Sequence, residues 1–77
     1  MRLSRHVKNN MRLYGISEED IQETIDTPDY REKQTGKVIV QKLFAERFSG
    51  YPLKVVYEEA EETFVITAYP VKKAYRR

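Results

Sequence analysis

The spacing of apolar residues changes near residue 30, and this change constrains the fold more than any other feature of the chain. Before it, apolar residues recur every three or four positions, at Leu3, Val7, Met11 and Tyr14. Such spacing is typical of one buried face of an α-helix. After it, apolar and polar residues alternate, which is typical of β-strands that bury one face. Because 77 residues suffice for one thin core, we predict a single α+β domain over residues 1–77.

Two helices are predicted in the first third of the chain. Ser4 and Ser17 are placed as N-caps, because their hydroxyls can accept hydrogen bonds from the N–H groups of a first helical turn. Asp20, three residues after Ser17, completes a weak form of the capping box. Gly15 is the residue type that commonly follows a helix. Thr27-Pro28 ends the second helix, because a residue before proline disfavours helical geometry.

Strands are predicted in the rest of the chain, at residues 30–34, 37–47, 53–58 and 64–69. Turn-forming clusters separate them, at Thr35-Gly36, Phe48–Pro52 and Glu58–Glu62. In the last strand, Phe64, Ile66 and Ala68 alternate with Val65, Thr67 and Tyr69, so the two sets are expected on opposite faces. We expect a three- or four-stranded antiparallel sheet, with the two N-terminal helices on one face. Pro70 ends the last strand, and residues 71–77 form a basic tail.

The charges of the chain are segregated, although its net charge is only +2. The first sixteen residues hold no acid, the only histidine, His6, and four cations: Arg2, Arg5, Lys8 and Arg12. The next sixteen hold seven acids against one base, Arg31. Segregated charge creates a local field that a partner or a charged substrate can use.

The composition argues against metal sites, cofactors and membrane insertion. With no cysteine and one histidine, a structural zinc site is not expected, and three scattered glycines form no phosphate-binding loop. We therefore expect no metal and no cofactor. No apolar run approaches the roughly 20 residues that cross a bilayer, and no signal-peptide pattern opens the chain. We therefore expect a cytoplasmic protein that does not contact a membrane.

Three segments carry a resemblance to a known family. The stretch from His6 to Ser17 resembles the opening of a small prokaryotic family of unknown function, which typically reads His-Ala-x-x-Arg-Met-x-x-Arg-Gly-Ile-Ser. Asn10 and Tyr14 stand where that pattern has its two arginines. Residues 51–57 and 65–70 resemble the family's final hairpin, which ends in Thr-x-Tyr-Pro. That family is similar in fold to the RelE/ParE-type toxins, whose RNA-cleaving members use basic and tyrosine side chains. The resemblance implies a RelE/ParE-like fold and RNA as the substrate.

Four residues form the predicted catalytic site: His6, Arg47, Lys54 and Tyr69. RNA cleavage by attack of the 2′-hydroxyl needs a base, an acid and cations near the phosphate, without a metal ion. His6 is the candidate base or acid, because imidazole exchanges protons near neutral pH. Arg47 and Lys54, expected on neighbouring strands, would stabilise the phosphate, and Tyr69 would stack on or orient the RNA. The alternative for His6 is a structural role at the border of the first helix.

Six further residues are predicted to contact RNA: Arg5, Lys8, Arg12, Lys72, Lys73 and Tyr75. The first three cluster on one side of the predicted helix, where they can bind phosphates. The alternative is an ordinary solvated face. The last three lie in the basic tail, where tyrosine can stack on a base while lysine holds its phosphate. The alternative there is a solubilising chain end.

A competing hypothesis makes the protein a non-catalytic interaction module. A strand at the edge of a sheet presents unpaired backbone groups, which can pair with a strand of another protein. The partner would be an antitoxin-like segment or a second copy of the chain. The two hypotheses differ in salt dependence, because phosphate binding weakens steeply as salt rises, whereas an apolar interface does not.

Overall fold

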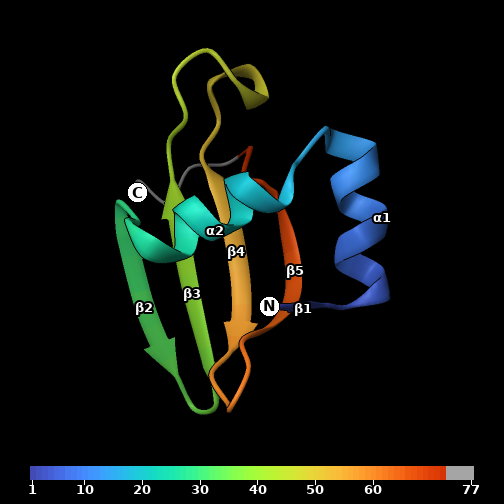
Figure 1. Cartoon of the computed structure of the whole chain (residues 1–77). Helices are drawn as coiled ribbons and strands as arrows, with labels where there is room; N and C mark the ends of the chain where they lie inside the picture. The colour runs from blue at the N-terminus through green and yellow to red at the C-terminus, as the bar shows by residue number, and fades with distance from the viewer. Residues whose placement is uncertain (73–77) are drawn as a thin grey trace.

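Two α-helices and a five-stranded mixed sheet make up the chain in the computed structural model, which describes residues 1–72 (Figure 1). In chain order the elements are β1 (Arg2–Leu3), α1 (Arg5–Tyr14), α2 (Glu18–Asp26), β2 (Tyr30–Gln34), β3 (Lys37–Lys42), the short 3₁₀-helix η1 (Phe48–Gly50), β4 (Leu53–Glu58) and β5 (Phe64–Pro70). Across the sheet the order is β1-β5-β4-β3-β2, with β1 parallel to β5 and the other neighbours antiparallel. The predicted α+β class is confirmed. Neither helix is long and apolar enough to cross a membrane within the described residues.

The predicted helix caps are confirmed. Ser4 caps α1, and its Oγ accepts a hydrogen bond of 3.0 Å from the backbone N–H of Val7. Gly15 follows α1 with a positive φ of 70°, a conformation that glycine adopts without steric cost. Ser17 and Asp20 form both bonds of the capping box at the start of α2. These local signals fix where each helix begins and ends.

The core lies between α2 and one face of the sheet. α2 crosses in front of the inner strands and contacts β3 and β4 (Figure 1). The buried apolar residues come from both helices, their connection and the strands β3, β4 and β5: Val7, Ile16, Ile21, Val38, Val40, Leu53, Val55, Tyr57, Val65 and Ala68. Each inner strand therefore turns one face towards α2 and the other face away from it.

α1 lies along the outer edge of β5 (Figure 1). Two polar side chains, one on the N-cap of α1 and one within the helix, donate hydrogen bonds to backbone carbonyls of β5. Both carbonyls lie beyond the two residues of β5 that pair with β1. Ser4 Oγ donates to the carbonyl of Ile66 at 2.7 Å, and Asn10 Nδ2 donates to the carbonyl of Ala68 at 3.2 Å. Val7, between them along the helix, is fully buried. Because an open strand edge invites pairing with other chains, α1 closes this side of the sheet.

The sheet differs from the prediction in strand number and direction. Residues 2–3, expected within or just before a helix, instead pair in parallel with the start of β5, so the sheet has five strands and is mixed. The strand predicted at 37–47 was too long, because β3 ends at Lys42. The next backbone N–H, that of Leu43, donates to Asp29 Oδ2 at 2.8 Å instead of continuing the ladder. Glu46 then adopts a positive φ of 61°, which no strand allows.

A β-bulge changes which residues of β5 face the core. The pairing of β4 with β5 shifts between Val56 and Tyr57, so that Val56 lies opposite Thr67 and Tyr57 lies opposite Val65. The extra residue in β5 reverses the alternation that the sequence predicts. Val65 and Ala68 are both buried in the core, whereas they were expected on opposite faces. Thr67 lies on the face away from α2.

Candidate functional site

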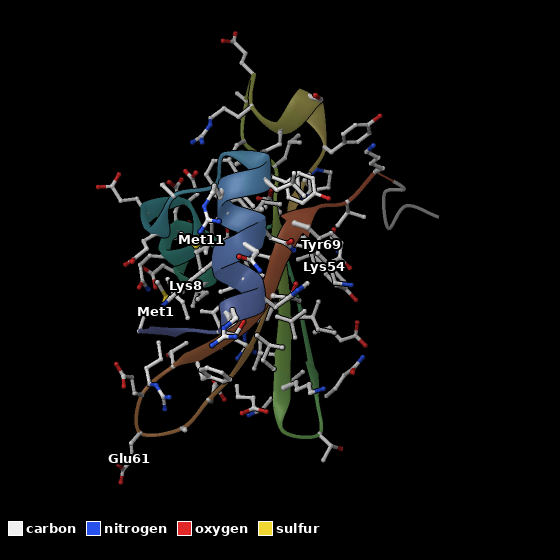
Figure 2. All side chains as sticks on the ribbon, turned by 90° about the vertical axis from the view of Figure 1, so that its right-hand side faces the viewer. Met1, Lys8, Met11, Lys54, Glu61 and Tyr69 are labelled. Carbon is white, nitrogen blue, oxygen red and sulfur yellow. The ribbon has the colours of Figure 1, made fainter. Side chains whose placement is uncertain are left out.

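The face of the sheet opposite α2 carries a group of polar, aromatic and apolar side chains, which we call the open face. Cross-strand neighbours in register lie on the same face of a sheet. One row across β3, β4 and β5 consists of Gln41, Lys54 and Tyr69, and the adjacent row consists of Ile39, Val56 and Thr67. These six residues define the open face. Figure 2 shows Lys54 and Tyr69 on the side of the sheet away from α2, and no helix of residues 1–72 covers that side.

A cation and an aromatic ring are held together at the centre of the open face. Lys54 Nζ lies 5.6 Å from the centre of the Tyr69 ring, which is within the range of a cation–π interaction. The positive charge of Lys54 also acts on β2. Hydrogen bonds from Gln34 and Tyr30 lower the pKa of Glu32, and the charge of Lys54 lowers it further. Both side chains of the pair remain partly exposed to solvent.

Two buried polar atoms of the open face have no hydrogen-bond partner among the described residues. They are Gln41 Oε1 and Thr67 Oγ1. Gln41 is only 6% exposed. Buried polar atoms are nearly always paired, because an unpaired one costs about 1–3 kcal/mol. Because neither atom is accessible to solvent, a molecule on this face can pair with them only after the side chains that cover them move aside.

His6 lies beside β5 at the border of the open face. Its Nε2 is 3.5 Å from the side-chain amide of Asn10, which in turn donates to the Ala68 carbonyl. Side chains on a helix are rotated by about 100° per residue. Relative to the buried Val7, His6 is rotated about 100° to one side and Met11 about 40° to the other. Because Met11 packs on the core, the exposed imidazole of His6 lies on the side of the open face.

The predicted basic stripe of α1 lies away from His6. Lys8 is on the side of α1 where Met11 lies, and Figure 2 shows both side chains away from Lys54. Helical spacing directs Arg5 and Arg12 outwards to solvent, and both are exposed. The structure therefore does not bring these three cations to the open face, and their contact with RNA stays a prediction. Lys72 is exposed just after β5, while Lys73 and Tyr75 lie outside the described residues.

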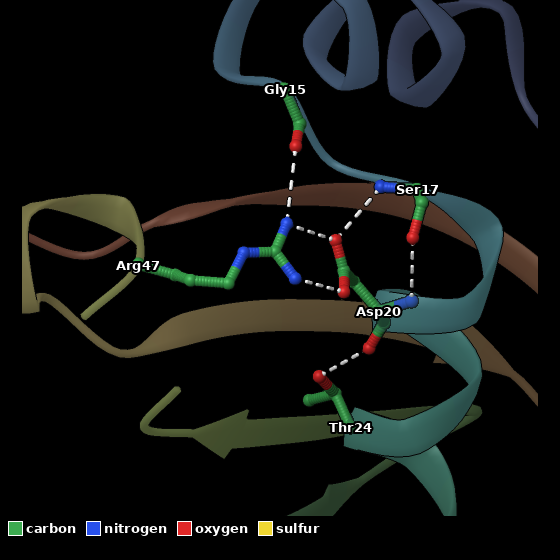
Figure 3. Close-up of polar contacts among 5 residues, drawn as sticks. All are labelled: Gly15, Ser17, Asp20, Thr24 and Arg47. Carbon is green, nitrogen blue, oxygen red and sulfur yellow. Dashed lines mark hydrogen bonds and ion pairs between the residues drawn. The ribbon is translucent and has the colours of Figure 1, made fainter. Parts of the chain in front are cut away.

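Arg47 lies away from the position expected for it. It is not on a strand next to Lys54, whose neighbour on β3 is Gln41. Arg47 instead lies in the loop between β3 and β4, on the α2 side of the molecule. Its Nη1 and Nη2 donate to the two carboxylate oxygens of Asp20 (Figure 3). The two N–O distances are 2.7 and 2.8 Å, and Nη2 also contacts the Gly15 carbonyl at 3.5 Å. We call this pair the Asp20–Arg47 clamp.

The Asp20–Arg47 clamp joins three segments of the chain. The Asp20 carboxylate, whose side chain is 7% exposed, also accepts the backbone N–H of Ser17 at 3.0 Å. The guanidinium carbon of Arg47 lies 4.8 Å from the centre of the Phe48 ring and 5.8 Å from that of Phe44. The clamp therefore fixes the loop after β3 to the junction of α1 and α2. Its donors are directed at Asp20 and Gly15, which gives Arg47 a structural role.

The clamp predicts a dependence of stability on acid. Burial raises the pKa of Asp20, but the hydrogen bonds from Arg47 and Ser17 outweigh burial and hold the pKa below its usual value of 3.8. A depressed pKa stabilises the fold above that value, and the stability is lost as pH falls through the lower folded-state value. We expect the melting temperature of the wild type to fall more steeply between pH 5 and pH 2 than that of Asp20→Asn. Parallel curves in thermal denaturation monitored by circular dichroism would contradict this expectation.

Sequence reasoning missed the two polar residues of the open face whose side chains have buried, unpaired atoms. Thr67 was present in the Thr-x-Tyr-Pro pattern of the resemblance, two residues before Tyr69, and that spacing was the available signal. Gln41 was hidden within a predicted strand that ran too far, and only the strand register reveals it as the neighbour of Lys54. Among residues 1–72, no three His, Cys, Asp or Glu side chains gather closely enough to hold a metal ion.

Comparison with known proteins gives the family of the chain. A family model described as a domain of unknown function, DUF4258, matches residues 3–70. This range includes both helices, the strands β2 to β5 and every residue of the open face. No curated protein and no solved structure matches the sequence. The chain therefore belongs to the DUF4258 family, whose function is unknown.

Proposed function

We propose that the protein binds single-stranded RNA on the open face and cleaves it without a metal ion. The observation that carries the proposal is the pair of Lys54 and Tyr69, held 5.6 Å apart on a face that no helix of the described residues covers. An aromatic ring stacks on an unpaired base, while a neighbouring cation binds the phosphate. This combination suits single-stranded nucleic acid better than an apolar ligand.

The unpaired polar atoms of the open face support the same ligand class. Gln41 Oε1 can accept a hydrogen bond from a base amino group or from a ribose hydroxyl. Thr67 Oγ1 can both donate and accept. The 2′-hydroxyl of ribose is itself a donor and an acceptor, and it distinguishes RNA from DNA. Such pairing requires RNA binding to uncover both atoms, because neither is accessible to solvent in the free protein.

His6 is the proposed proton-transfer group. In cleavage, a base removes the proton of the 2′-hydroxyl, the oxygen attacks the phosphorus, and the bond to the 5′-oxygen breaks as that oxygen gains a proton. His6 would serve as the base or the acid, with Asn10 orienting its ring through the 3.5 Å contact. Lys54 would stabilise the charge of the phosphate. Arg47 has no part in the proposed site, because it is engaged by Asp20.

We further propose that the fold is of the RelE/ParE type. Support comes from the motif resemblance and from the arrangement of two helices followed by an antiparallel run from β2 to β5. Fold likeness alone does not transfer function, so the proposal of RNA binding depends on the residues of the open face.

Lys54→Met tests RNA binding directly, because methionine keeps the packing on Tyr69 but removes the charge. We expect the affinity for a fluorescently labelled single-stranded RNA to fall about five- to tenfold. The slope of log K against log salt should become shallower by about 0.7, the value for one phosphate contact on a single strand. The control is Lys33→Met, because Lys33 lies on β2 beside Glu59, at 3.4 Å, and faces the α2 side. Equal losses in the two variants would remove Lys54 from the proposal.

A second candidate function is the docking of a protein strand at β2. This strand is the last of the sheet order, and all five of its residues are exposed. A symmetric antiparallel pair of two copies centred on Glu32 would place Glu32 opposite Glu32 and Arg31 opposite Lys33. Like charges directly opposite one another destabilise such a pair. The edge therefore suits an acidic partner strand better than a second copy.

The charges of β2 predict that the chain does not pair with itself through this edge. Sedimentation velocity at increasing concentration should give one species with the 9.2 kDa mass of the monomer. If a dimer forms, Arg31→Glu distinguishes its origin, because this change would place opposite charges across a β2–β2 pair and strengthen it. A dimer that Arg31→Glu strengthens would contradict the prediction.

A further inference from the structure

A groove of about 620 Å³ lies at the end of β5, between the C-terminal end of α1 and the loop that contains η1. Its principal lining residues are Leu13, Tyr14, Phe48, Tyr51, Pro70 and Lys72. A volume of this size falls within the range of ligand-binding pockets. We call the hollow lined by these residues the base groove.

Large apolar and aromatic side chains are left exposed at the base groove. Leu13 is 72% exposed and Tyr51 is 37% exposed, and Tyr14 is similarly accessible. One cation, Lys72, completes the lining. Exposed tyrosines beside a lysine can stack on a nucleobase and bind its phosphate, because the ring offers a flat apolar surface and the ammonium offers a charge.

The wall of the base groove is held in an uncommon backbone conformation. Phe48 and Ser49 both have a positive φ of 55°, and Glu46 has one of 61°. Such conformations cost about 1–3 kcal/mol each in residues other than glycine, and they gather at ligand sites. The Asp20–Arg47 clamp supports this wall, because the Arg47 guanidinium lies over the Phe48 ring. The loop is thus fixed in the shape that presents Phe48 and Tyr51 to the groove.

The base groove begins one residue beyond the open face along β5, because Pro70 lines the groove and Tyr69 belongs to the open face. Pro70 directly follows Tyr69, although the two side chains point to opposite faces of the sheet. Leu13 lies two helical turns after His6 on the same side of α1, at a rise of about 10 Å. A single strand whose phosphate lies at Lys54 can therefore reach the groove with a neighbouring nucleotide.

We propose that the base groove is a second RNA subsite, which binds one nucleobase next to the phosphate held at Lys54. This inference rests on the proposed function, and it adds the recognition of a base through Tyr14 and Tyr51. A base held by two tyrosines gives the protein a preference for unpaired RNA, because a paired base must first be unpaired and unstacked before it can enter the groove, at a cost of a few kcal/mol.

The test uses adenosine monophosphate and uridine monophosphate as probes, with ribose 5-phosphate as the matched control without a base. In NMR titrations of the full chain, we expect the nucleotides to shift the backbone amides of Leu13, Tyr51 and Lys72. Ribose 5-phosphate should shift only Lys72. Equal shifts with all three probes would indicate phosphate capture alone and would overturn the subsite.

Tyr51→Ala should weaken the binding of labelled single-stranded RNA about tenfold, consistent with the loss of one stacked base. Leu43→Ala is the control, because Leu43 is also an exposed apolar residue but does not line the groove. If RNA shifts the backbone amide signals of Lys54 and Tyr69 but not those of Leu13 and Tyr51, the subsite is overturned. The proposed function then remains intact. If RNA shifts the amide signals of Leu13 and Tyr51 but not that of Lys54, the result supports the groove as an RNA site. It removes the open face from the proposed function.

Discussion

Asp20→Ala is expected to lower the melting temperature by about 15 °C, because it removes three hydrogen bonds at one partly enclosed site. Two of them come from Arg47 and one from the backbone N–H of Ser17. We expect the free energy of unfolding to fall by about 2–3 kcal/mol, less than for a fully buried ion pair, because the Arg47 side chain is 44% exposed. A small domain is marginally stable, so this is a large share of its total stability.

Glu19→Ala is the matched control for Asp20→Ala, because Glu19 lies in the same helical turn but is exposed. Its melting temperature should stay within a few degrees of that of the wild type. Equal melting temperatures of the two variants in differential scanning calorimetry would contradict the structural role of the clamp.

Arg47→Met separates structure from catalysis. We expect it to lower stability and to weaken RNA binding at the base groove, while leaving the single-turnover rate at saturating RNA within about twofold in an assay well below its melting temperature.

His6→Ala is expected to reduce the rate of RNA cleavage by at least about 100-fold, the usual effect of removing a general acid or base. RNA affinity should change by less than about twofold, because His6 is exposed at the border of the open face and Lys54 and Tyr69 remain. The measurement is single-turnover cleavage of an end-labelled single-stranded RNA, with a chelator present throughout.

Lys8→Ala is the control for His6→Ala, because Lys8 lies on the same helix but on the side away from the open face. It should leave the single-turnover rate at saturating RNA unchanged, even if Lys8 contributes to RNA affinity. Cleavage that persists in His6→Ala would remove the imidazole from the mechanism. Cleavage lost only when the chelator is added would replace the metal-independent mechanism with a metal-dependent one. An inactive wild type that still binds RNA would limit the proposal to binding.

The parts of the fold that depend on neighbouring residues could be predicted from the sequence. The caps at Ser4 and Ser17 act over three residues, so their signals stand together in the chain. The strand at 37–47 was predicted too long, because apolar residues continue past Lys42, at 43–45, while the partner strand does not. Lys42 pairs with Leu53, the first residue of β4, and no residue of β4 remains to pair with those that follow. A strand needs a neighbour, and the sequence of one strand does not contain that information.

The candidate site could be predicted only in part for the same reason. Lys54 and Tyr69 lie directly opposite each other in the register of β4 and β5. The alternation of residues along the two strands of a hairpin is compatible with this pairing. Arg47 was misplaced because its partner, Asp20, lies 27 residues earlier in the chain and on another element. The sequence shows that the second helix is acidic and that Arg47 is basic. It does not show which carboxylate of that helix the guanidinium of Arg47 binds. Only the packed structure selects one.

The position of α1 has a consequence for biosynthesis. Its side chains bind carbonyls of β5 across separations of 62 and 58 residues, between Ser4 and Ile66 and between Asn10 and Ala68. Translation produces the helix well before the strand on which it docks. The nascent helix therefore cannot dock until β5 has left the ribosome. His6 takes its place beside β5 only after β5 has been made, so the proposed site is assembled late in synthesis.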